Sequence, residues 1–211
     1  QESRGLGDVY KRQINKSNYF YNLSQIEKRI DKDKIAVVIK NNAYGHGLLE
    51  IGQLANEYGI KHAIVCTIKE ANLISHLFET VLVLQDLPKD KVPDNVTITI
   101  NSLNDINKIP NGTKIEIEVD TGMHRNGILT EELDLALKLI IKFDLILNWV
   151  FTHFSNAYLN DKSLSVQKQV FDEIRNTIKS DNRFSDNIRF HCCASSSLFR
   201  LDNFDYDLAR I

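Results

Sequence analysis

The sequence lacks the features that mark several large classes of protein. No apolar run approaches the roughly 18 residues that a bilayer-spanning helix needs, and no charged-then-apolar leader with a small-residue cleavage site opens the chain. No block of lysine and arginine is dense enough to follow the phosphates of a nucleic acid, and the formal net charge is -2. We therefore expect a cytoplasmic protein that binds neither membranes nor nucleic acids.

Cysteine is also scarce: the chain has Cys66, Cys192 and Cys193. An odd number with two adjacent members fits neither a disulfide framework nor a zinc spacing such as C-x-x-C. We expect reduced, mostly buried thiols and no metal site.

Proline-rich linkers, repeats and low-complexity segments are missing, so we place no internal domain boundary. A chain of 211 residues with 43% apolar content can bury one large core, and α/β barrels commonly run to roughly 200–250 residues as one domain. Residues 1–13 have no start methionine and no periodicity, and we expect them to be a non-native leader. The domain is expected to cover residues 14–211 and to be cut near its last strand, because Ile211 lies in a predicted strand with no turn or cap after it.

Short apolar runs alternate with amphipathic segments along the rest of the chain. Strands that are apolar throughout are covered on both faces, which favours a parallel sheet with helices outside it. The sequence therefore predicts an α/β fold closed as a (β/α)8 barrel of the TIM type, with a doubly wound open sheet as the alternative. The eight predicted strands cover residues 35–40, 62–66, 81–85, 96–100, 114–120, 145–152, 187–192 and 206–211.

Amphipathic segments between these strands predict the helices. The longest covers residues 165–178, where Val166, Val170, Ile174 and Ile178 are spaced by four, as on one face of a helix. The other predicted helices cover residues 22–30, 48–58, 69–77 and 131–142.

In a barrel of this type the chemistry gathers where strands end, because the loops after them share one rim. Lys40 ends the apolar strand 35–40. A lysine at the mouth of such a strand is partly desolvated, which disfavours its charged form and leaves a nucleophilic amine that can bond covalently to an aldehyde. The ordinary alternative is a solvated strand terminus.

The residues after Lys40 make the pattern specific. The string Asn41-Asn42-Ala43-Tyr44-Gly45-His46-Gly47 places two glycines and a tyrosine in a loop that enters a helix. Residues 36–40 and 43–47 together resemble the cofactor-lysine signature of the alanine racemases. The resemblance implies that Lys40 carries pyridoxal 5'-phosphate and that Tyr44 binds its phosphate.

A second segment, residues 118–127, resembles the family's D-T-G-M-x-R-x-G stretch. The resemblance implies that Arg125 meets the phenolic oxygen of the cofactor and the carboxylate of the substrate, a role that suits a planar, permanently charged guanidinium. Where the family often has a carbamylated lysine, this chain has Glu118. We hypothesise that the Glu118 carboxylate orients Arg125; a solvated or inward-facing strand glutamate is the alternative.

Two further strand ends continue the resemblance in the same order. His153, in the string Thr-His-Phe, corresponds to a histidine that packs near the cofactor ring. Ser195 lies in a segment loosely similar to the family's H-x-A-N-S-A and corresponds to a serine that binds phosphate, a role that suits a hydroxyl at a helix N-terminus. Ala194 replaces the family's asparagine and removes one polar group from the cofactor side.

Arg210 lies in a segment that resembles the start of the family's R-x-G-I stretch. The resemblance implies a hydrogen bond from this arginine to the pyridine nitrogen of the cofactor. Because an arginine gives up its proton reluctantly, the ring stays a poorer electron sink, which favours racemisation over transamination.

Together these segments imply an isomerase of the alanine racemase type, with Lys40 and Arg125 as catalytic residues, that interconverts L- and D-alanine for peptidoglycan. A racemase needs bases on opposite faces of its substrate. Lys40 can serve one face; the resemblance places the second base, a tyrosine, in a later β domain and in the partner of a homodimer. We therefore expect the 211-residue chain alone to be inactive.

Other functions stay open at this point. The same cofactor also serves barrel enzymes that act on other amino acids, including other racemases and decarboxylases. A non-catalytic barrel that carries pyridoxal phosphate would use Lys40 to hold the cofactor without a second base. In a barrel without this cofactor, Lys40 would be neither a cofactor lysine nor a base.

Overall fold

A computed structural model describes residues 13–159, 162–184 and 187–211 of the chain. All of the predicted leader except Gln13 lies outside the described residues, so that expectation stays a prediction. Among the described helices none is long and apolar enough to cross a membrane.

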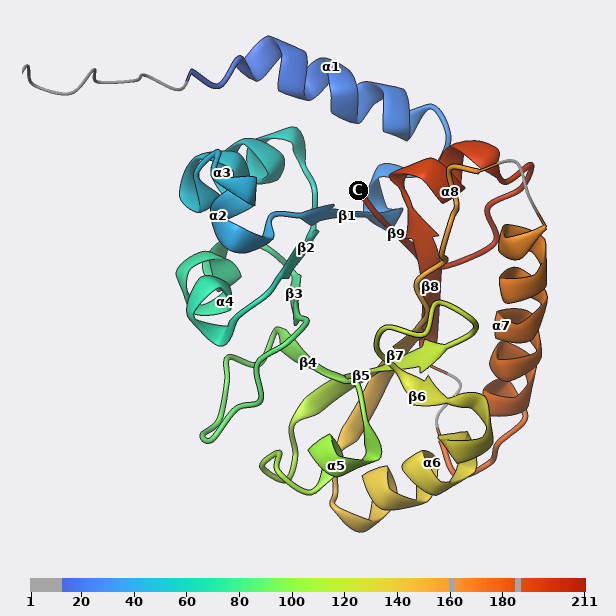
Figure 1. Cartoon of the computed structure of the whole chain (residues 1–211). Helices are drawn as coiled ribbons and strands as arrows, with labels where there is room; N and C mark the ends of the chain where they lie inside the picture. The colour runs from blue at the N-terminus through green and yellow to red at the C-terminus, as the bar shows by residue number, and fades with distance from the viewer. Residues whose placement is uncertain (1–12, 160–161, 185–186) are drawn as a thin grey trace, which may run out of the picture.

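Eight parallel strands close into a barrel, which Figure 1 shows along its axis with the helices arranged outside. In the order β4-β3-β2-β1-β9-β8-β7-β5 each strand pairs with the next, and a β4–β5 pairing closes the ring. The closed ring confirms the predicted barrel over the open sheet. The barrel strands are β1 (Ile35–Val38), β2 (His62–Val65), β3 (Thr80–Val83), β4 (Val96–Ile100), β5 (Lys114–Asp120), β7 (Ile146–Phe151), β8 (Arg189–Ala194) and β9 (Leu208–Arg210).

The strand bounds follow the predicted apolar runs closely. β4 and β5 begin and end where the sequence predicts, while β1 and β9 are shorter than residues 35–40 and 206–211. One short strand was not predicted: β6 (Ile128–Leu129) pairs in parallel with the end of β5.

The helices lie between the strands in sequence and cover the outside of the barrel (Figure 1). α3 matches its predicted bounds. The helix ahead of the first strand begins earlier than predicted, because the Asn15 side chain caps it by accepting a hydrogen bond from the Asn18 N–H at 3.0 Å. The helices are α1 (Lys16–Glu27), α2 (Lys40–Tyr44), α3 (Leu48–Tyr58), α4 (Ile68–Ile74), α5 (Leu103–Ile106), α6 (Leu133–Lys142), α7 (Ser163–Lys179) and α8 (Ser195–Arg200), with single 3-10 turns at η1 (Lys32–Lys34), η2 (Ser75–Leu77) and η3 (Thr130–Glu132).

Buried apolar side chains form two separate clusters, one on each face of the barrel sheet. The larger cluster, here called the outer core, packs the sheet against the helices and includes Ile35, Phe171 and Phe190. The smaller cluster fills the inside of the barrel and is here called the inner cluster; it consists of Ala36, Ile64, Leu82, Trp149, Phe151 and Leu208. Because side chains alternate faces along a strand, neighbouring residues of one strand join different clusters.

The buried face of α7 contains Ile174 and Ile178, as predicted, but not Val166. Val166 is 56% exposed, whereas Gln167 is 3% exposed and lies on the buried face with Phe171 and Ile174. Gln167 is buried because its side chain binds a neighbouring loop. Its Oε1 accepts hydrogen bonds from the backbone N–H of Ser155 at 3.0 Å and from the Ser155 hydroxyl at 2.9 Å. These bonds hold α7 to the loop that follows β7.

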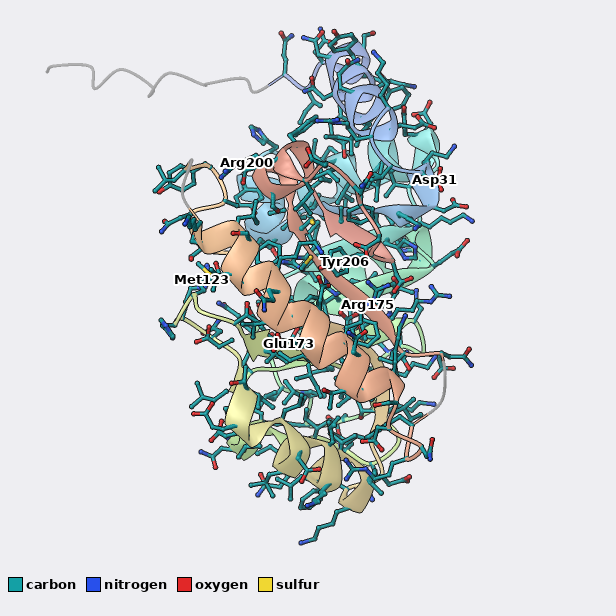
Figure 2. The ribbon with its side chains drawn as sticks, turned by 90° about the vertical axis from the view of Figure 1, so that its right-hand side faces the viewer. Asp31, Met123, Glu173, Arg175, Arg200 and Tyr206 are labelled. Carbon is teal, nitrogen blue, oxygen red and sulfur yellow. The ribbon has the colours of Figure 1, made fainter. Side chains whose placement is uncertain are left out.

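Tyr206 also contacts α7, and Figure 2 shows it close to Arg175 of this helix. Its side chain is fully buried, and its hydroxyl donates to Asp172 of α7 at 2.7 Å. The Arg175 guanidinium lies 5.3 Å from the ring centroid of Tyr206, in a cation–π arrangement. Tyr206 therefore belongs to the outer core rather than to β9, where the sequence placed it.

The two ends of the barrel can be told apart in Figure 2 by three labelled residues. Met123, after β5, and Arg200, at the end of α8, lie towards one end, and Asp31, ahead of β1, lies towards the other. The three cysteines are buried and unpaired, as predicted, and the Sγ atoms of Cys192 and Cys193 are 3.7 Å apart.

Candidate active site at the mouth of the barrel

A cavity of about 580 Å³ opens where the barrel strands end. This size lies within the roughly 300–1,000 Å³ of small-molecule sites. We call it the mouth cavity. All six predicted site residues line it, together with the two positions where the chain departs from the family pattern: Lys40, Tyr44, Arg125, His153, Ser195, Arg210, Glu118 and Ala194.

The chain makes an unusual left-handed turn directly after Lys40. Asn41, Asn42, Ala43 and Tyr44 have φ between 50° and 55°, a region in which each residue other than glycine costs roughly 1–2 kcal/mol. Asparagine tolerates this conformation better than most residues do, which suits the first two positions. The turn carries Tyr44 round to the wall of the cavity that contains Lys40.

Glu70 holds this turn in place. Its carboxylate accepts hydrogen bonds from the backbone N–H of Asn42 at 2.9 Å and of Cys66 at 3.0 Å. The Asn42 side chain in turn accepts from the Leu48 N–H, at the start of α3, at 2.8 Å. The Glu70 side chain thus ties the loop after β1 to the loop after β2. Sequence analysis did not single out Glu70, since a helical glutamate at such a position is ordinarily a surface residue.

Asp120 shapes the loop that carries Arg125. One carboxylate oxygen accepts from three successive backbone N–H groups, those of Gly122, Met123 and His124, at 2.9–3.0 Å. Burial alone would raise the pKa of Asp120, but these hydrogen bonds outweigh it and hold the pKa below its usual value.

Gly127 closes the same loop against the strand. Its φ is +112°, and a Cβ there would lie 2.7 Å from the backbone nitrogen of Asp120. A residue without a side chain is therefore required where the chain comes alongside β5 to form β6.

Glu118 and Arg125 line the same cavity, but no ion pair joins their side chains within the part of the chain that the structure describes. Burial raises the pKa of Glu118 above its usual value, against the lowering effects of the positive charges of Arg210 and Arg125. The structure therefore shows no direct contact through which Glu118 would orient Arg125. This role of Glu118 stays a hypothesis for the substrate-bound site.

His153 is a neutral imidazole in this site. Burial, followed by the positive charges of Arg210, Arg125 and Lys40, lowers its pKa to about 4. Its Nδ1 lies 3.3 Å from Nη2 of Arg210. A neutral ring can pack against an aromatic cofactor without adding to the positive charge of the cavity.

Arg210 is 6% exposed, and the end of the barrel core fixes it. Nη2 donates to the carbonyl of Thr152 at 2.8 Å, and Nη1 donates to Nδ1 of His191 at 2.6 Å. The guanidinium carbon lies 5.1 Å from the ring centroid of Phe151. This arginine is therefore preorganised before any ligand enters, because its donors are already directed by neighbouring groups.

Ser195 begins α8, and Ala194 occupies the capping position before it. Alanine has no side-chain oxygen to satisfy the first backbone N–H groups of the helix. The Ser197 hydroxyl instead accepts from the Ala194 N–H at 2.8 Å. The Ser195 hydroxyl therefore lines the cavity at the start of α8, where the side chain of the capping residue accepts no hydrogen bond from the first backbone N–H groups.

The charges of the mouth cavity suit an anionic ligand. Lys40, Arg125 and Arg210 contribute three cationic side chains, and Glu118 contributes one carboxylate. An aldehyde that bears a phosphate and a phenolic oxygen fits this set, because the amine, the guanidinium groups and the hydroxyls each have a partner on it. Leu84, Ile64 and Phe151, which sequence analysis did not name, add an apolar wall for a planar ring.

Comparisons with known proteins concern the family and the fold of the chain. The family model described as "Alanine racemase, N-terminal domain" matches residues 14–211. The chain is 36% identical to an alanine racemase of Campylobacter jejuni over 188 residues, which are 89% of this chain and 56% of that protein. It is 37% identical to an alanine racemase of Nitratiruptor over 194 residues, with 90% and 57% covered. The chain thus spans a little over half the length of these curated relatives.

Solved structures match in fold. The alanine racemase of Bacillus anthracis is 25% identical with a TM-score of 0.81, over 93% of this chain and 54% of that chain. A histidine racemase of Leuconostoc mesenteroides, at 22% identity and a TM-score of 0.75, covers 92% of this chain and 56% of that chain, and it shares the fold.

Proposed function

The chain belongs to the family of alanine racemase N-terminal domains, and from this premise we propose that it is the pyridoxal-phosphate-binding barrel of a racemase that interconverts L- and D-alanine. One observation carries the proposal. Six side chains from separate parts of the sequence converge on the mouth cavity, and each has the chemistry that the cofactor or an amino acid requires.

When bound, pyridoxal phosphate supplies an aldehyde that bonds to amines and a ring that acidifies the α-hydrogen of an amino acid. Lys40 would hold the cofactor covalently, and Tyr44 and Ser195 would bind its phosphate. Arg210 would donate to the pyridine nitrogen. Arg125 would bind the phenolic oxygen and the carboxylate of alanine.

The environment of Arg210 favours racemisation. Its neighbours accept hydrogen bonds from it, and a guanidinium keeps its proton, so the pyridine nitrogen of a bound cofactor would receive a hydrogen bond rather than a proton. The Lys40 amine, displaced by the substrate amine, would move the α-proton on one face of alanine. The second base would be a tyrosine outside this chain, in the partner of a homodimer. We place the enzyme in the cytoplasm, where it would supply D-alanine for peptidoglycan.

Proton exchange tests this proposal. The chain, loaded with pyridoxal phosphate, is incubated in D2O with L-alanine or D-alanine, and the α-hydrogen is followed by proton NMR. If the chain has a base on only one face of the substrate, we expect the α-hydrogen of one enantiomer of alanine to exchange without inversion. We expect no useful racemisation. Robust conversion of L- to D-alanine by this chain alone would refute the requirement for a second base outside it.

The same assay separates the alternatives. Exchange of histidine or serine but not alanine would point to a racemase of another specificity, and the shared fold of a histidine racemase makes histidine the first amino acid to compare. Bound cofactor without exchange of any amino acid would point to a non-catalytic carrier.

A further inference from the structure

A line of buried polar groups runs from Arg210 into the barrel and ends on Glu116, a residue to which no role has so far been given. His191, which is fully buried, lies between them: its Nδ1 is 2.6 Å from Nη1 of Arg210, and its Nε2 is 2.9 Å from Oε2 of Glu116. The other oxygen of Glu116 accepts from the Thr97 hydroxyl at 2.7 Å.

The donors and acceptors in this line can be assigned in one consistent way. A guanidinium has donors and no acceptor, so Nδ1 of His191 must accept from Arg210 and carries no hydrogen. A neutral imidazole has its hydrogen on the other nitrogen, so Nε2 must donate. Oε2 of Glu116 is the acceptor that receives it. This holds whether or not the glutamate is protonated, provided that a proton on it sits on the oxygen facing Thr97.

Ring packing prevents His191 from escaping this assignment by turning. The ring is stacked on Phe151 at 4.7 Å with an interplanar angle of 11°, and the Trp149 ring meets it edge-on at 5.6 Å. With the ring fixed, Nδ1 always faces Arg210, and the acceptor next to Nε2 decides whether Nδ1 is free to accept from it.

We infer that Glu116 is a positioning residue that fixes the Nε2–H tautomer of His191 and, through it, the direction of the Arg210 guanidinium at the mouth cavity. Without an acceptor at position 116, the Nδ1–H tautomer would become competitive. Its N–H would then oppose an N–H of Arg210, and the guanidinium would have to rotate. The consequence for cofactor binding rests on the proposed function; the tautomer itself does not.

Three substitutions separate this role from a general loss of packing. Glu116→Gln keeps an oxygen acceptor for His191 and removes the charge. Glu116→Met removes the acceptor while filling similar space. Thr99→Val is the matched control, because Thr99 is a buried threonine of the same strand as Thr97 whose hydroxyl has no hydrogen-bond partner among the described residues.

Nitrogen-15 NMR of the histidine rings in the cofactor-free chain reads the tautomer directly, and titration with pyridoxal phosphate reads the cofactor affinity. We expect the Nε2–H form of His191 in the parent, in Glu116→Gln and in Thr99→Val, with similar affinities. In Glu116→Met we expect a mixture of tautomers and an affinity lower by about tenfold, the scale of one lost hydrogen bond to a charged group.

Two results would overturn the inference. One is an Nδ1–H or doubly protonated His191 in the parent chain. The other is Glu116→Met with the parent's tautomer and the parent's affinity. If the parent binds no pyridoxal phosphate, the proposed function fails, and the tautomers of the parent and of Glu116→Met alone decide the inference. If Glu116→Met does not fold, Glu116→Ala, which also lacks an acceptor for His191, replaces it in the same two measurements. The parent's tautomer and affinity in that variant would count against the inference.

Discussion

The outer core and the barrel interior share the same eight strands but differ in the polarity of their side chains. The outer core is apolar almost throughout, with Phe171 and Phe190 fully buried among aliphatic side chains. The barrel interior combines the small inner cluster with buried ionisable groups, among them Glu116, His191 and Arg210. The difference shows that the sheet is stabilised mainly from outside, which leaves its inside free to hold groups that cost stability and direct chemistry.

The largest test of this division is a pair of phenylalanine substitutions, one on each side of the sheet. Phe171→Ala should lower the free energy of unfolding by about 3–5 kcal/mol, because the cavity forms in a close-packed region. Phe151→Leu should cost about 1.5 kcal/mol or less but weaken binding of pyridoxal phosphate, since it removes the ring beneath Arg210. Urea unfolding and cofactor titration measure the two effects. Equal loss of cofactor affinity in both variants, at temperatures where both are folded, would contradict the division.

The pH dependence of stability sharpens the comparison, because the outer core has little to titrate. Burial raises the folded pKa of Glu116 to about 7 from 4.5, so the stability it contributes is full below pH 4.5 and is lost as the pH rises through 7. His153 acts in the opposite direction: its folded pKa is about 4 against 6.5, so its contribution is present above pH 6.5 and is lost as the pH falls through 4.

The two effects oppose each other in the parent between about pH 4.5 and 6.5, so the difference between variants is the informative quantity. Relative to Glu116→Gln, the parent should lose about 3 kcal/mol of unfolding free energy as the pH rises from 4 to 8. Urea unfolding across this range gives the difference. Parallel profiles for parent and variant would mean that Glu116 titrates normally.

A smaller effect is expected from the loop that joins β5 to β6. Gly127→Ala should destabilise the fold by about 1–3 kcal/mol, because alanine is strained at this φ and its Cβ would clash with the Asp120 backbone. Gly112→Ala is the matched control: its φ is also positive, at +75°, but nothing lies within 4 Å of an added Cβ. Thermal unfolding that shows equal losses for the two would rule out the close approach as the cause.

The smallest effect is expected at Glu118. Glu118→Gln should raise stability slightly at neutral pH, because burial raises the pKa of the Glu118 carboxyl, but weaken the binding of alanine by less than about tenfold, if the Glu118 charge helps to direct Arg125 when substrate is present. The cofactor-loaded protein, titrated with alanine, measures this. Unchanged alanine affinity and exchange activity would end the hypothesis.

The barrel could be predicted from the sequence because apolar strands and amphipathic helices carry strong periodic signals. Ile174 and Ile178 of the predicted α7 face are buried, but spacing alone could not show that Gln167 is buried to bind the Ser155 backbone while Val166 is exposed. The left-handed turn after Lys40 also could not be predicted, since the Glu70 carboxylate that supports it lies on a distant helix.

The motifs predicted the residues of the candidate site, but they did not predict the contacts between those residues. Nothing in the sequence near Arg210 shows that His191 and Glu116 lie beneath it, because both come from other strands and meet it through barrel closure. An expected side-chain contact, Glu118 with Arg125, does not form in the structure. Resemblance therefore identified which residues face the mouth cavity, and tertiary packing determines what each one touches.

The proposed function depends most directly on the covalent bond between Lys40 and pyridoxal phosphate. The chain is mixed with equimolar cofactor and reduced with borohydride, which fixes the linkage, and the modified lysine is identified by peptide mass spectrometry. Lys40→Ala is compared with Lys114→Ala, a lysine at the start of β5 and thus at the opposite end of the barrel. Modification at Lys40 in the parent and in Lys114→Ala, and its loss in Lys40→Ala, is the predicted result; modification that spares Lys40, or that persists undiminished in Lys40→Ala, would contradict the account.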